Sequence, residues 1–328
     1  MASVKIKEIV VYHPEKMVTN EELAKGLKDQ AESMIDLWRY FGRDKRYLSG
    51  NGENTLEMAI KASRKLLRET GLSGSDIDMI VVSSGTHEYN IPTDASFVHQ
   101  AIFGKNECVI YDTNANCVGM VVAFDHISRM MMQNPKMKYA LLVGSEQLSL
   151  FYGENDIASL GLCGDAACAV LLERVEGEGL GFMDSVYFTS TEKPEDLRLP
   201  GNGFSKSIVP GSDNKIYLAD GYNVDLAFPT ASANINKMLA ENGVTKSQVS
   251  AYMLSQLNVN VIYRIADDLE DDIEKFPYIG DRYGYTGTSS PFIALYHAMG
   301  DKKLREGDLF VLWSVGAGIT SCGVLARL

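Results

Sequence analysis

The sequence predicts a layered α/β fold made of two related halves, and two observations support this prediction. Apolar runs of strand length alternate with longer stretches in which apolar residues recur at helical spacing, which is typical of layered α/β proteins with largely parallel sheets. The chain also repeats itself, because LLRETGLSGSDIDMIVVSS (66–84) matches MLAENGVTKSQVSAYMLSQ (238–256) at an offset of 172 residues. In both copies a helix ends in Glu-X-Gly-aliphatic, and an apolar strand follows a short loop.

The elements expected in the first half alternate as this architecture requires. An opening strand is followed by a turn at Pro14 and by a helix that Thr19 or Asn20 can cap. A helix over 55–70 is expected to end at Gly71, because glycine tolerates the left-handed C-cap conformation. The remaining expected elements are helices at 34–41 and 93–103, strands at 77–83, 109–111 and 139–144, and a helix that starts at Met120.

Two further pairs of similar segments indicate where the two halves lie. KYALLVGSE (138–146) resembles DLFVLWSVG (308–316), and CAVLL (168–172) resembles CGVLA (322–326). We therefore predict an N-terminal half, 1–174, and a C-terminal half, 175–328, joined by the connector VEGEG. The strand after the first Glu-X-Gly signal and its duplicate are expected to lie side by side across a pseudo-twofold axis.

The composition excludes several functional classes. The 328 residues have a formal net charge of −12, and nucleic acid is an unfavourable partner because phosphate binding requires a basic face. Five cysteines without CxxC spacing indicate a reducing compartment rather than a zinc site or a disulfide framework. No apolar run reaches the length of a membrane span, so we expect a cytoplasmic protein. Gly164, Gly316 and Gly318 lack the context of a nucleotide loop, and we predict no cofactor and no metal.

Cys117 is the strongest catalytic candidate. The stretch 109–130 (VIYDTNANCVGMVVAFDHISRM) reads as a strand, a turn of small and amide residues, and a helix after the cysteine. This places Cys117 at or beside a helix N-terminus, where unpaired N–H groups and the helix dipole favour the nucleophilic thiolate. The alternative is a small buried hydrophobe, which describes most free cysteines.

An ordered set of motifs runs along the chain: KMVTNEEL (16–23), DIDMIVVSSGTHEYNIP (76–92), DTNANCVGM (112–120), LLVGSEQLS (141–149), GDAACAVL (164–171) and ADGYNV (219–224). In this order and spacing, the set resembles the β-ketoacyl-acyl-carrier-protein synthase III (KAS III) enzymes of the thiolase superfamily. The resemblance covers the whole chain and implies a thiolase-like duplicated fold with layers α-β-α-β-α, assembled as a dimer. It also implies that Cys117 takes an acyl group from a thioester.

The sequence departs from the family at two positions that stabilise an enolate. The family's His-Gln-Ala-Asn motif reads SQLN (255–258), which puts Ser255 at the His position. Its Gly-Asn-Thr-Ser motif reads GYTG (284–287), which puts Tyr285 at the Asn position. Loss of one oxyanion donor typically costs about 100- to 1,000-fold in rate, so we expect no malonyl decarboxylation by the usual route.

Other positions of the implied site are still occupied by competent residues. The acyl-oxyanion hole uses the amide of Cys117 and an amide of the C-terminal glycine-rich loop, where Ala317 replaces a usual Gly. Gln256 and Asn258, from the SQLN motif, are expected to bind substrate. His87 is a candidate substitute base, and a surface or interface role is its alternative.

Substrate entry also differs from the family. The Trp and Arg that clamp adenine are replaced by Asp36 and Tyr40, and Trp38 and Arg39 lie out of register. The family's carrier-protein docking helix is basic, whereas the segment 267–274 here has six acids among eight residues. We expect this surface to repel an acidic carrier protein, unless it is simply a solvated helix face.

Three functions are compatible with these residues. The first is a KAS III-like acyltransferase that accepts an acyl group on Cys117 from a coenzyme A or carrier-protein thioester, without malonyl decarboxylation. The second is a catalytically degenerate partner subunit of an active KAS III-like heterodimer. The third is an ordinary 3-oxoacyl-ACP synthase III that initiates fatty-acid or polyketide synthesis. Under all three we expect an acyl thioester ligand, a homodimer or heterodimer, and neither nucleic acid nor membrane as partner.

Overall fold

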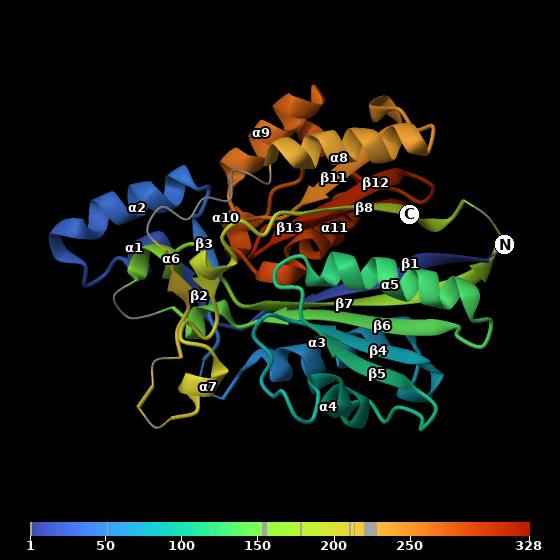
Figure 1. The fold of residues 1–328 in the computed structure, drawn as a ribbon, viewed down its shortest axis with the longest axis horizontal. Helices are drawn as coiled ribbons and strands as arrows, with labels where there is room; N and C mark the ends of the chain where they lie inside the picture. Colours follow the sequence, from blue (N-terminus) through green and yellow to red (C-terminus); the bar gives the residue numbers. More distant parts are fainter. Residues whose placement is uncertain are drawn as a thin grey trace.

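The strands lie in two layers, and helices cover both layers and fill the space between them (Figure 1). The computed structural model describes residues 2–50, 52–152, 156–177, 179–209, 211–212, 214–219 and 228–328. This arrangement confirms the predicted five-layer fold. The inner helices are α5 (Gly119–Gln133) and α11 (Ser290–Gly300), and the outer ones are α3 (Thr55–Thr70) and α4 (Asp94–Ala101) on one side and α8 (Phe228–Glu241) and α9 (Val259–Leu269) on the other.

The main sheet of the described chain has the strand order β11-β12-β13-β8-β1-β7-β6-β4-β5. A single residue pair, Val4 with Gly181, joins its two groups of strands. The strands are β1 (Ala2–Tyr12), β4 (Met79–Ser83), β5 (Val109–Thr113), β6 (Tyr139–Glu146), β7 (Ala166–Glu176), β8 (Gly181–Thr189), β11 (Val249–Leu254), β12 (Leu309–Gly316) and β13 (Thr320–Arg327).

The prediction of largely parallel sheets is wrong, because the main sheet is mixed. β4 pairs in parallel with β5 and β6, and β11 with β12. The pairs β1–β7, β6–β7, β12–β13 and β8–β13 are antiparallel. The physical reason is that β13 follows β12 through a short turn, and only antiparallel neighbours can be joined in that way.

Shorter elements form the end of the molecule to the left in Figure 1. Thr19 caps α1 with a capping box, as its sequence position predicts. These elements are β2 (Met17–Thr19), α1 (Asn20–Leu23), α2 (Ala31–Tyr40), β3 (Lys45–Tyr47), α6 (Ile157–Leu160), β9 (Leu197–Arg198), α7 (Phe204–Ser207), β10 (Tyr217–Leu218) and α10 (Gly280–Tyr283).

Three apolar clusters fill the space between the layers. The central one joins α5 and α11 to both groups of strands, with Phe124 and Phe292 in edge contact at its middle. A second cluster lies between α8, α9 and β11–β13, and a third between α3, α4 and β4, β6 and β7. Because the outer helices bury one face against strands and the inner helices are enclosed between both groups of strands, removal of apolar surface from water stabilises every layer.

The strand order β4-β6-β7-β1 on one side of the Val4–Gly181 pair has a counterpart, β11-β12-β13-β8, on the other. This order agrees with a duplicated unit, and the division at residue 174 stays a prediction. The expectation that β4 and its duplicate β11 lie side by side is wrong. They lie near opposite ends of the sheet, because β1 and β8 are the strands that meet.

Two further expectations concern segments rather than the core. Gly71 ends α3 with φ at +70°, as predicted, and Asn54 caps its other end by accepting the Glu57 amide. The motif ADGYNV lies outside the described residues from Asp220 onward.

In the described part of the chain, no helix combines the length and the apolar character that crossing a bilayer requires.

Candidate active site

Cys117 lies in a tight turn between β5 and α5. The turn needs a left-handed residue, and Asn116 supplies it with φ at +53°, a conformation that Asn adopts more readily than most side chains. The Gly119 amide donates to the Asn116 carbonyl at 3.0 Å, which starts the helix. Cys117 therefore precedes the first helical residue by two positions, as the sequence predicts.

The end of β12 and the turn after it pack against the Cys117 turn. The Ser314 hydroxyl donates to the Cys117 carbonyl at 2.8 Å. Gly316 packs so closely on the turn that a Cβ there would lie 3.0 Å from the Ala115 carbonyl oxygen. Ala317 is the next residue, and its carbonyl accepts the Asn116 side-chain amide at 3.4 Å. Ala317 thus lies against the Cys117 turn, and its role in an oxyanion hole stays a prediction.

The second half contributes Ser255 and Tyr285 to the same place. Ser255 follows β11 directly, and its amide donates to the Trp313 carbonyl at 2.8 Å. Its hydroxyl donates to the Tyr285 phenol oxygen at 3.4 Å. The Tyr285 hydroxyl in turn hydrogen-bonds the Cys117 sulfur. Three predicted site residues are therefore in one chain of contacts, and Ser255 and Tyr285 are both buried.

Tyr285 is placed by a short backbone ladder. Its amide donates to the Leu162 carbonyl at 2.8 Å, and its carbonyl accepts the Gly164 amide at 2.9 Å. The two backbones approach so closely that a Cβ on Gly164 would lie 1.8 Å from the Tyr283 carbonyl oxygen. Only glycine fits at this point, so Gly164 fixes how far Tyr285 reaches toward Cys117.

A buried arginine connects the loops that carry these side chains. Arg43 donates to the carbonyls of Gln256 at 2.7 Å and Leu257 at 2.6 Å, in the loop after Ser255. Its Nε donates to the Leu162 carbonyl at 3.0 Å, at the foot of the Tyr285 ladder. Because these acceptors belong to two separate segments, the loop after Ser255 and the backbone partner of Tyr285, Arg43 fixes the positions of Ser255 and Tyr285 relative to each other.

Burial controls the ionisation of Cys117. It raises the pKa of the thiol to about 11, while the hydrogen bond from Tyr285 acts in the opposite direction and the charge of Glu146 adds to the rise. The expectation that the helix terminus holds a thiolate is therefore wrong for this state of the site. Desolvation of the sulfur outweighs the helix dipole, whose effect is modest.

Glu146 is a site residue that sequence reasoning missed. Its buried carboxylate ends β6 and accepts hydrogen bonds from the Gly85 amide at 3.0 Å and from the hydroxyls of Thr86 at 2.6 Å and Ser84 at 3.2 Å. Burial raises its pKa, and its charge acts on Cys117. The available signal was an acid directly after the apolar strand LLVGS, where a charge is costly unless it is paired.

A second thiol and a second phenol adjoin the site. Cys163 and Tyr152 hydrogen-bond each other, and both belong to the apolar cluster that includes Cys117 and Tyr285. Burial raises the pKa of Cys163 to about 12, so this thiol stays protonated at neutral pH. No spacing in the sequence indicated that these two residues belong to the site.

Gln256 and Asn258 have structural contacts. The Gln256 side chain is fully buried, donates to the Leu254 carbonyl at 2.8 Å and accepts the Ile279 amide at 2.8 Å. Asn258 caps α9 by accepting the Val261 amide at 2.9 Å. Both amides are thus engaged with backbone groups, and substrate binding by these residues stays a prediction.

The adenine clamp expected of the family is not rebuilt by neighbouring residues. Trp38 is fully buried, and its indole N–H donates to the Ala158 carbonyl at 3.0 Å. Arg39 points to the surface, where it pairs with Glu21 at 2.8 Å. Tyr40 is exposed beside them. Trp38 therefore has no ring face available for a ligand to stack on.

His87 is not directed at the cysteine. Its Nδ1 lies 3.1 Å from a carboxylate oxygen of Asp94, and its Nε2 lies 3.4 Å from the Thr113 carbonyl oxygen. Both ring nitrogens therefore face oxygen acceptors. This geometry does not support His87 as a substitute base for Cys117.

The raised pKa of Cys117 predicts a steep pH dependence for its alkylation. Below the pKa, the thiolate fraction rises about tenfold per pH unit, so the rate of reaction with iodoacetamide is expected to rise about tenfold per unit between pH 7 and 9. Peptide mapping of the alkylated protein measures this rate at Cys117 alone. A rate that levels off below pH 8 would show that the thiolate already predominates near neutrality, contrary to this expectation.

Comparison with known proteins gives a consistent result. Residues 111–191 match the family profile "3-Oxoacyl-[acyl-carrier-protein (ACP)] synthase III", and residues 239–328 match the profile of its C-terminal part. Together the matches span more than half of the chain and include Cys117, Ser255, Tyr285 and Ala317.

Curated relatives match along the whole chain. A β-ketoacyl-[acyl-carrier-protein] synthase III of Ehrlichia ruminantium (strain Welgevonden) is 27% identical over 328 residues, and one of Clostridium perfringens (strain SM101 / Type A) is 29% identical over 331; in both cases all of each chain is covered. Among solved structures, the synthase III of Aquifex aeolicus VF5 has a TM-score of 0.86 at 26% identity, and covers 99% of this chain and 100% of its own. A synthase of Burkholderia xenovorans LB400 has a TM-score of 0.90 at 19% identity, with 100% and 95% covered, which shows a shared fold.

Proposed function

Because the chain belongs to the 3-oxoacyl-[acyl-carrier-protein] synthase III family and is an acyltransferase of that family, we propose that Cys117 accepts an acyl group from a thioester and passes it on without malonyl decarboxylation. The acceptor is then a nucleophile or an already activated carbanion. We place this reaction in the cytoplasm, with no nucleic acid and no membrane as partner.

The observation that carries this proposal is the hydrogen bond from Tyr285 to Cys117, with Ser255 behind it. The second half of the chain thus presents the neutral Tyr285 hydroxyl to the sulfur, and the Ser255 hydroxyl contacts Tyr285 from behind. Serine and tyrosine hydroxyls are protonated near neutral pH, and neither is a proton acceptor of the kind that imidazole provides. The Tyr285 hydroxyl assists thioester exchange at Cys117, and neither the imidazole nor the amide that the family uses to stabilise an enolate is present at positions 255 and 285.

The transfer step balances with the groups present. The Cys117 sulfur forms a bond to the carbonyl carbon of the thioester, and the bond from that carbon to the donor sulfur breaks. The proton of the Cys117 thiol ends on the departing thiol. A hydrogen bond from Tyr285 stabilises negative charge on the attacking sulfur as the proton leaves.

The surface of α9 supports a donor other than a strongly acidic carrier protein. Lysines partly neutralise the acids of 267–274, because Lys275 pairs with Asp271 at 2.9 Å and Lys303 approaches Glu274 at 3.6 Å. Asp267 and Asp272 have no lysine or arginine partner in the described part of the chain. The electrostatic repulsion of an acidic carrier protein by this segment is thus weaker than the sequence alone suggests, but the net interaction is still repulsive.

Intact-mass measurement after incubation with a panel of acyl-CoA thioesters tests the proposal. The wild-type protein is expected to gain the mass of one acyl group per chain. The adduct should be lost entirely in Cys117→Ala, which removes the nucleophile. It should be kept in the control Cys108→Ala, whose side chain lies just before β5 and packs against the apolar cluster under α3 and α4. An adduct that persists in Cys117→Ala would overturn the assignment.

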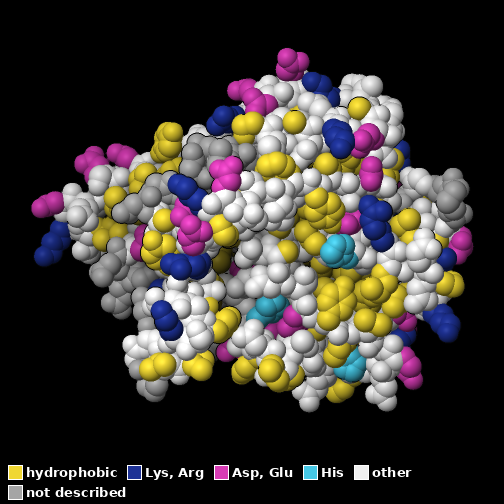
Figure 2. All heavy atoms as spheres, in the orientation of Figure 1, with side chains coloured by type: hydrophobic (Ala, Val, Ile, Leu, Met, Phe, Trp, Pro, Cys, Tyr) yellow, Lys and Arg dark blue, Asp and Glu magenta, His cyan; other side chains and the backbone are white. Residues whose placement is uncertain are grey.

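A catalytically degenerate partner subunit is the second candidate, and the raised pKa of Cys117 favours it. We propose a dimer, homomeric or heteromeric, through the edge strand β5. Val109 of this strand is exposed, as are Ile91 and Phe103 on either side of α4 in the sequence, and Figure 2 shows hydrophobic side chains gathered beside α5 on the same side of the molecule. An acyl adduct that forms only when a second KAS III-like protein is added would favour this candidate over the first.

A further inference from the structure

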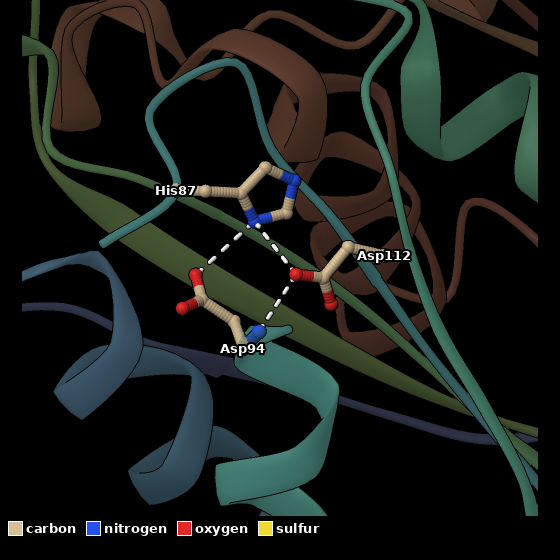
Figure 3. A group of neighbouring side chains, drawn as sticks. All are labelled: His87, Asp94 and Asp112. Carbon is tan, nitrogen blue, oxygen red and sulfur yellow. Dashed lines mark hydrogen bonds and ion pairs between the residues drawn. The ribbon is translucent and has the colours of Figure 1, made fainter. Parts of the chain in front are cut away.

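Three side chains converge at the N-terminus of α4, outside the contacts of the cysteine. Figure 3 shows His87, Asp94 and Asp112 directed at one another, from the loop after β4, the start of α4 and the strand β5. The Nδ1 atom of His87 lies 3.1 Å from Asp94 Oδ2 and 3.6 Å from Asp112 Oδ2. All three groups offer ligand atoms within 4.8 Å of one another, and the Asp94 side chain is fully buried.

The spacing of these atoms fits a small tetrahedral cation. Two ligands bonded to Zn²⁺ at about 2.0–2.1 Å are separated by about 3.3–3.4 Å. The two distances from His87 Nδ1, 3.1 and 3.6 Å, lie on either side of this value. One imidazole and two carboxylates are also ligand types that Zn²⁺ accepts.

The three candidate ligands are held by hydrogen bonds of the kind that orient ligands in metal sites. The remaining ring nitrogen of His87 faces the Thr113 carbonyl at 3.4 Å, which would fix the tautomer with Nδ1 free to bind a metal. The Asp112 carboxylate accepts the amides of Asp94 at 2.6 Å and Ala95 at 2.8 Å. The Asp94 carboxylate accepts the amides of Glu88 at 3.1 Å and Tyr89 at 3.2 Å. Each carboxylate is therefore held in place and still has lone pairs directed at His87.

The charges of the two carboxylates also favour a bound divalent cation. In the described part of the chain, neither Asp94 nor Asp112 pairs with a lysine or an arginine. Two carboxylates with little access to water are costly unless their charge is compensated. One imidazolium would compensate one of them, whereas a divalent cation bound to neutral His87 would compensate both.

From this geometry we propose that His87 Nδ1, Asp94 Oδ2 and Asp112 Oδ2 bind a divalent transition-metal cation of the Zn²⁺ class, with water completing its coordination. The cation would tie the loop after β4 and the start of α4 to β5, the strand that leads into the Cys117 turn. Its role is to hold that turn in place, and it takes no part in acyl transfer.

Titration of the metal-free protein with Zn²⁺ alone tests the site. After dialysis against EDTA, the wild-type protein is expected to bind about one Zn²⁺ per chain by isothermal titration calorimetry, and its Tm should rise on binding. Asp94→Asn keeps the shape of the side chain and removes its charge, and it should weaken binding by at least about 100-fold. The control His126→Ala removes an exposed imidazole of α5 and should leave binding unchanged.

Cobalt distinguishes this site from binding by the cysteines. Co²⁺ at the proposed site should give d–d absorption without a thiolate charge-transfer band, and Asp94→Asn should remove that absorption. Failure of the wild-type protein to bind Zn²⁺, equal affinity in a folded Asp94→Asn variant, or a thiolate band in the Co²⁺ spectrum would each overturn the proposal. Circular dichroism of Asp94→Asn establishes that the variant is folded, and His87→Gln provides an independent second removal of a ligand.

Discussion

Carbon dioxide release from malonyl-CoA by the wild-type protein is expected to stay at the uncatalysed background. The double variant Ser255→His, Tyr285→Asn should raise it by at least about 100-fold, because the variant restores two donors to an enolate and each donor is worth about 100- to 1,000-fold. Release of ¹⁴CO₂ from labelled malonyl-CoA measures the effect directly.

The double variant is preferable to either single one for a steric reason. Ser255 is buried 3.4 Å from the Tyr285 hydroxyl, so a histidine at 255 alone would meet the phenol. Exchange of tyrosine for asparagine frees the volume that the imidazole needs. Ser255→His with Tyr285 retained is the matched control and should stay near background. Rapid decarboxylation by the wild type would contradict the proposed function, since it would show that the hydroxyls of Ser255 and Tyr285 suffice.

Gly164→Ala is expected to lower stability by about 3 kcal/mol or more and to displace Tyr285 from Cys117. A Cβ at this position would lie 1.8 Å from the Tyr283 carbonyl oxygen, and neither backbone can yield without breaking the ladder between Gly164 and Tyr285. The midpoint of urea unfolding measures the stability. The alkylation rate of Cys117 at fixed pH reports the loss of the Tyr285 hydrogen bond, which otherwise favours the thiolate.

Gly300→Ala is the matched control for this substitution. Gly300 is the last residue of α11, and a Cβ there would meet nothing within 4 Å. Alanine favours a helix by up to about 1 kcal/mol over glycine, so stability should be unchanged or slightly higher. Equal unfolding midpoints for the two variants would show that the backbones around Gly164 can separate at little cost, and that Gly164 does not fix the position of Tyr285.

Local sequence predicted the elements well where a local signal exists. The helix α3 was bounded correctly because Asn54 and Gly71 are adequate caps on their own. Cys117 was placed correctly before α5 because the change from strand to helical periodicity lies within one short stretch. The mixed direction of the sheet was missed, because the antiparallel pairing of β7 with both β1 and β6 leaves no mark on any single strand.

It was easier to predict which residues form the site than to predict how these residues act chemically. The family motifs predicted that Cys117, Ser255 and Tyr285 belong to one site, and the structure places these residues in contact. Glu146 was missed because a single acid at a strand end becomes informative only when Ser84, Gly85 and Thr86 are seen around it. The cluster of His87, Asp94 and Asp112 was missed for the same reason, since its members come from three elements.

The sequence by itself determined the alternation of strands and helices, the internal repeat and the choice of Cys117 as the candidate nucleophile, because each depends on residues close together in the chain or on a motif. Tertiary structure alone decided how acidic Cys117 is and which groups face it. A pKa depends on the loss of water around the sulfur and on charges brought near it, and both arise only when Tyr285 and Glu146, distant in sequence, are packed against that turn.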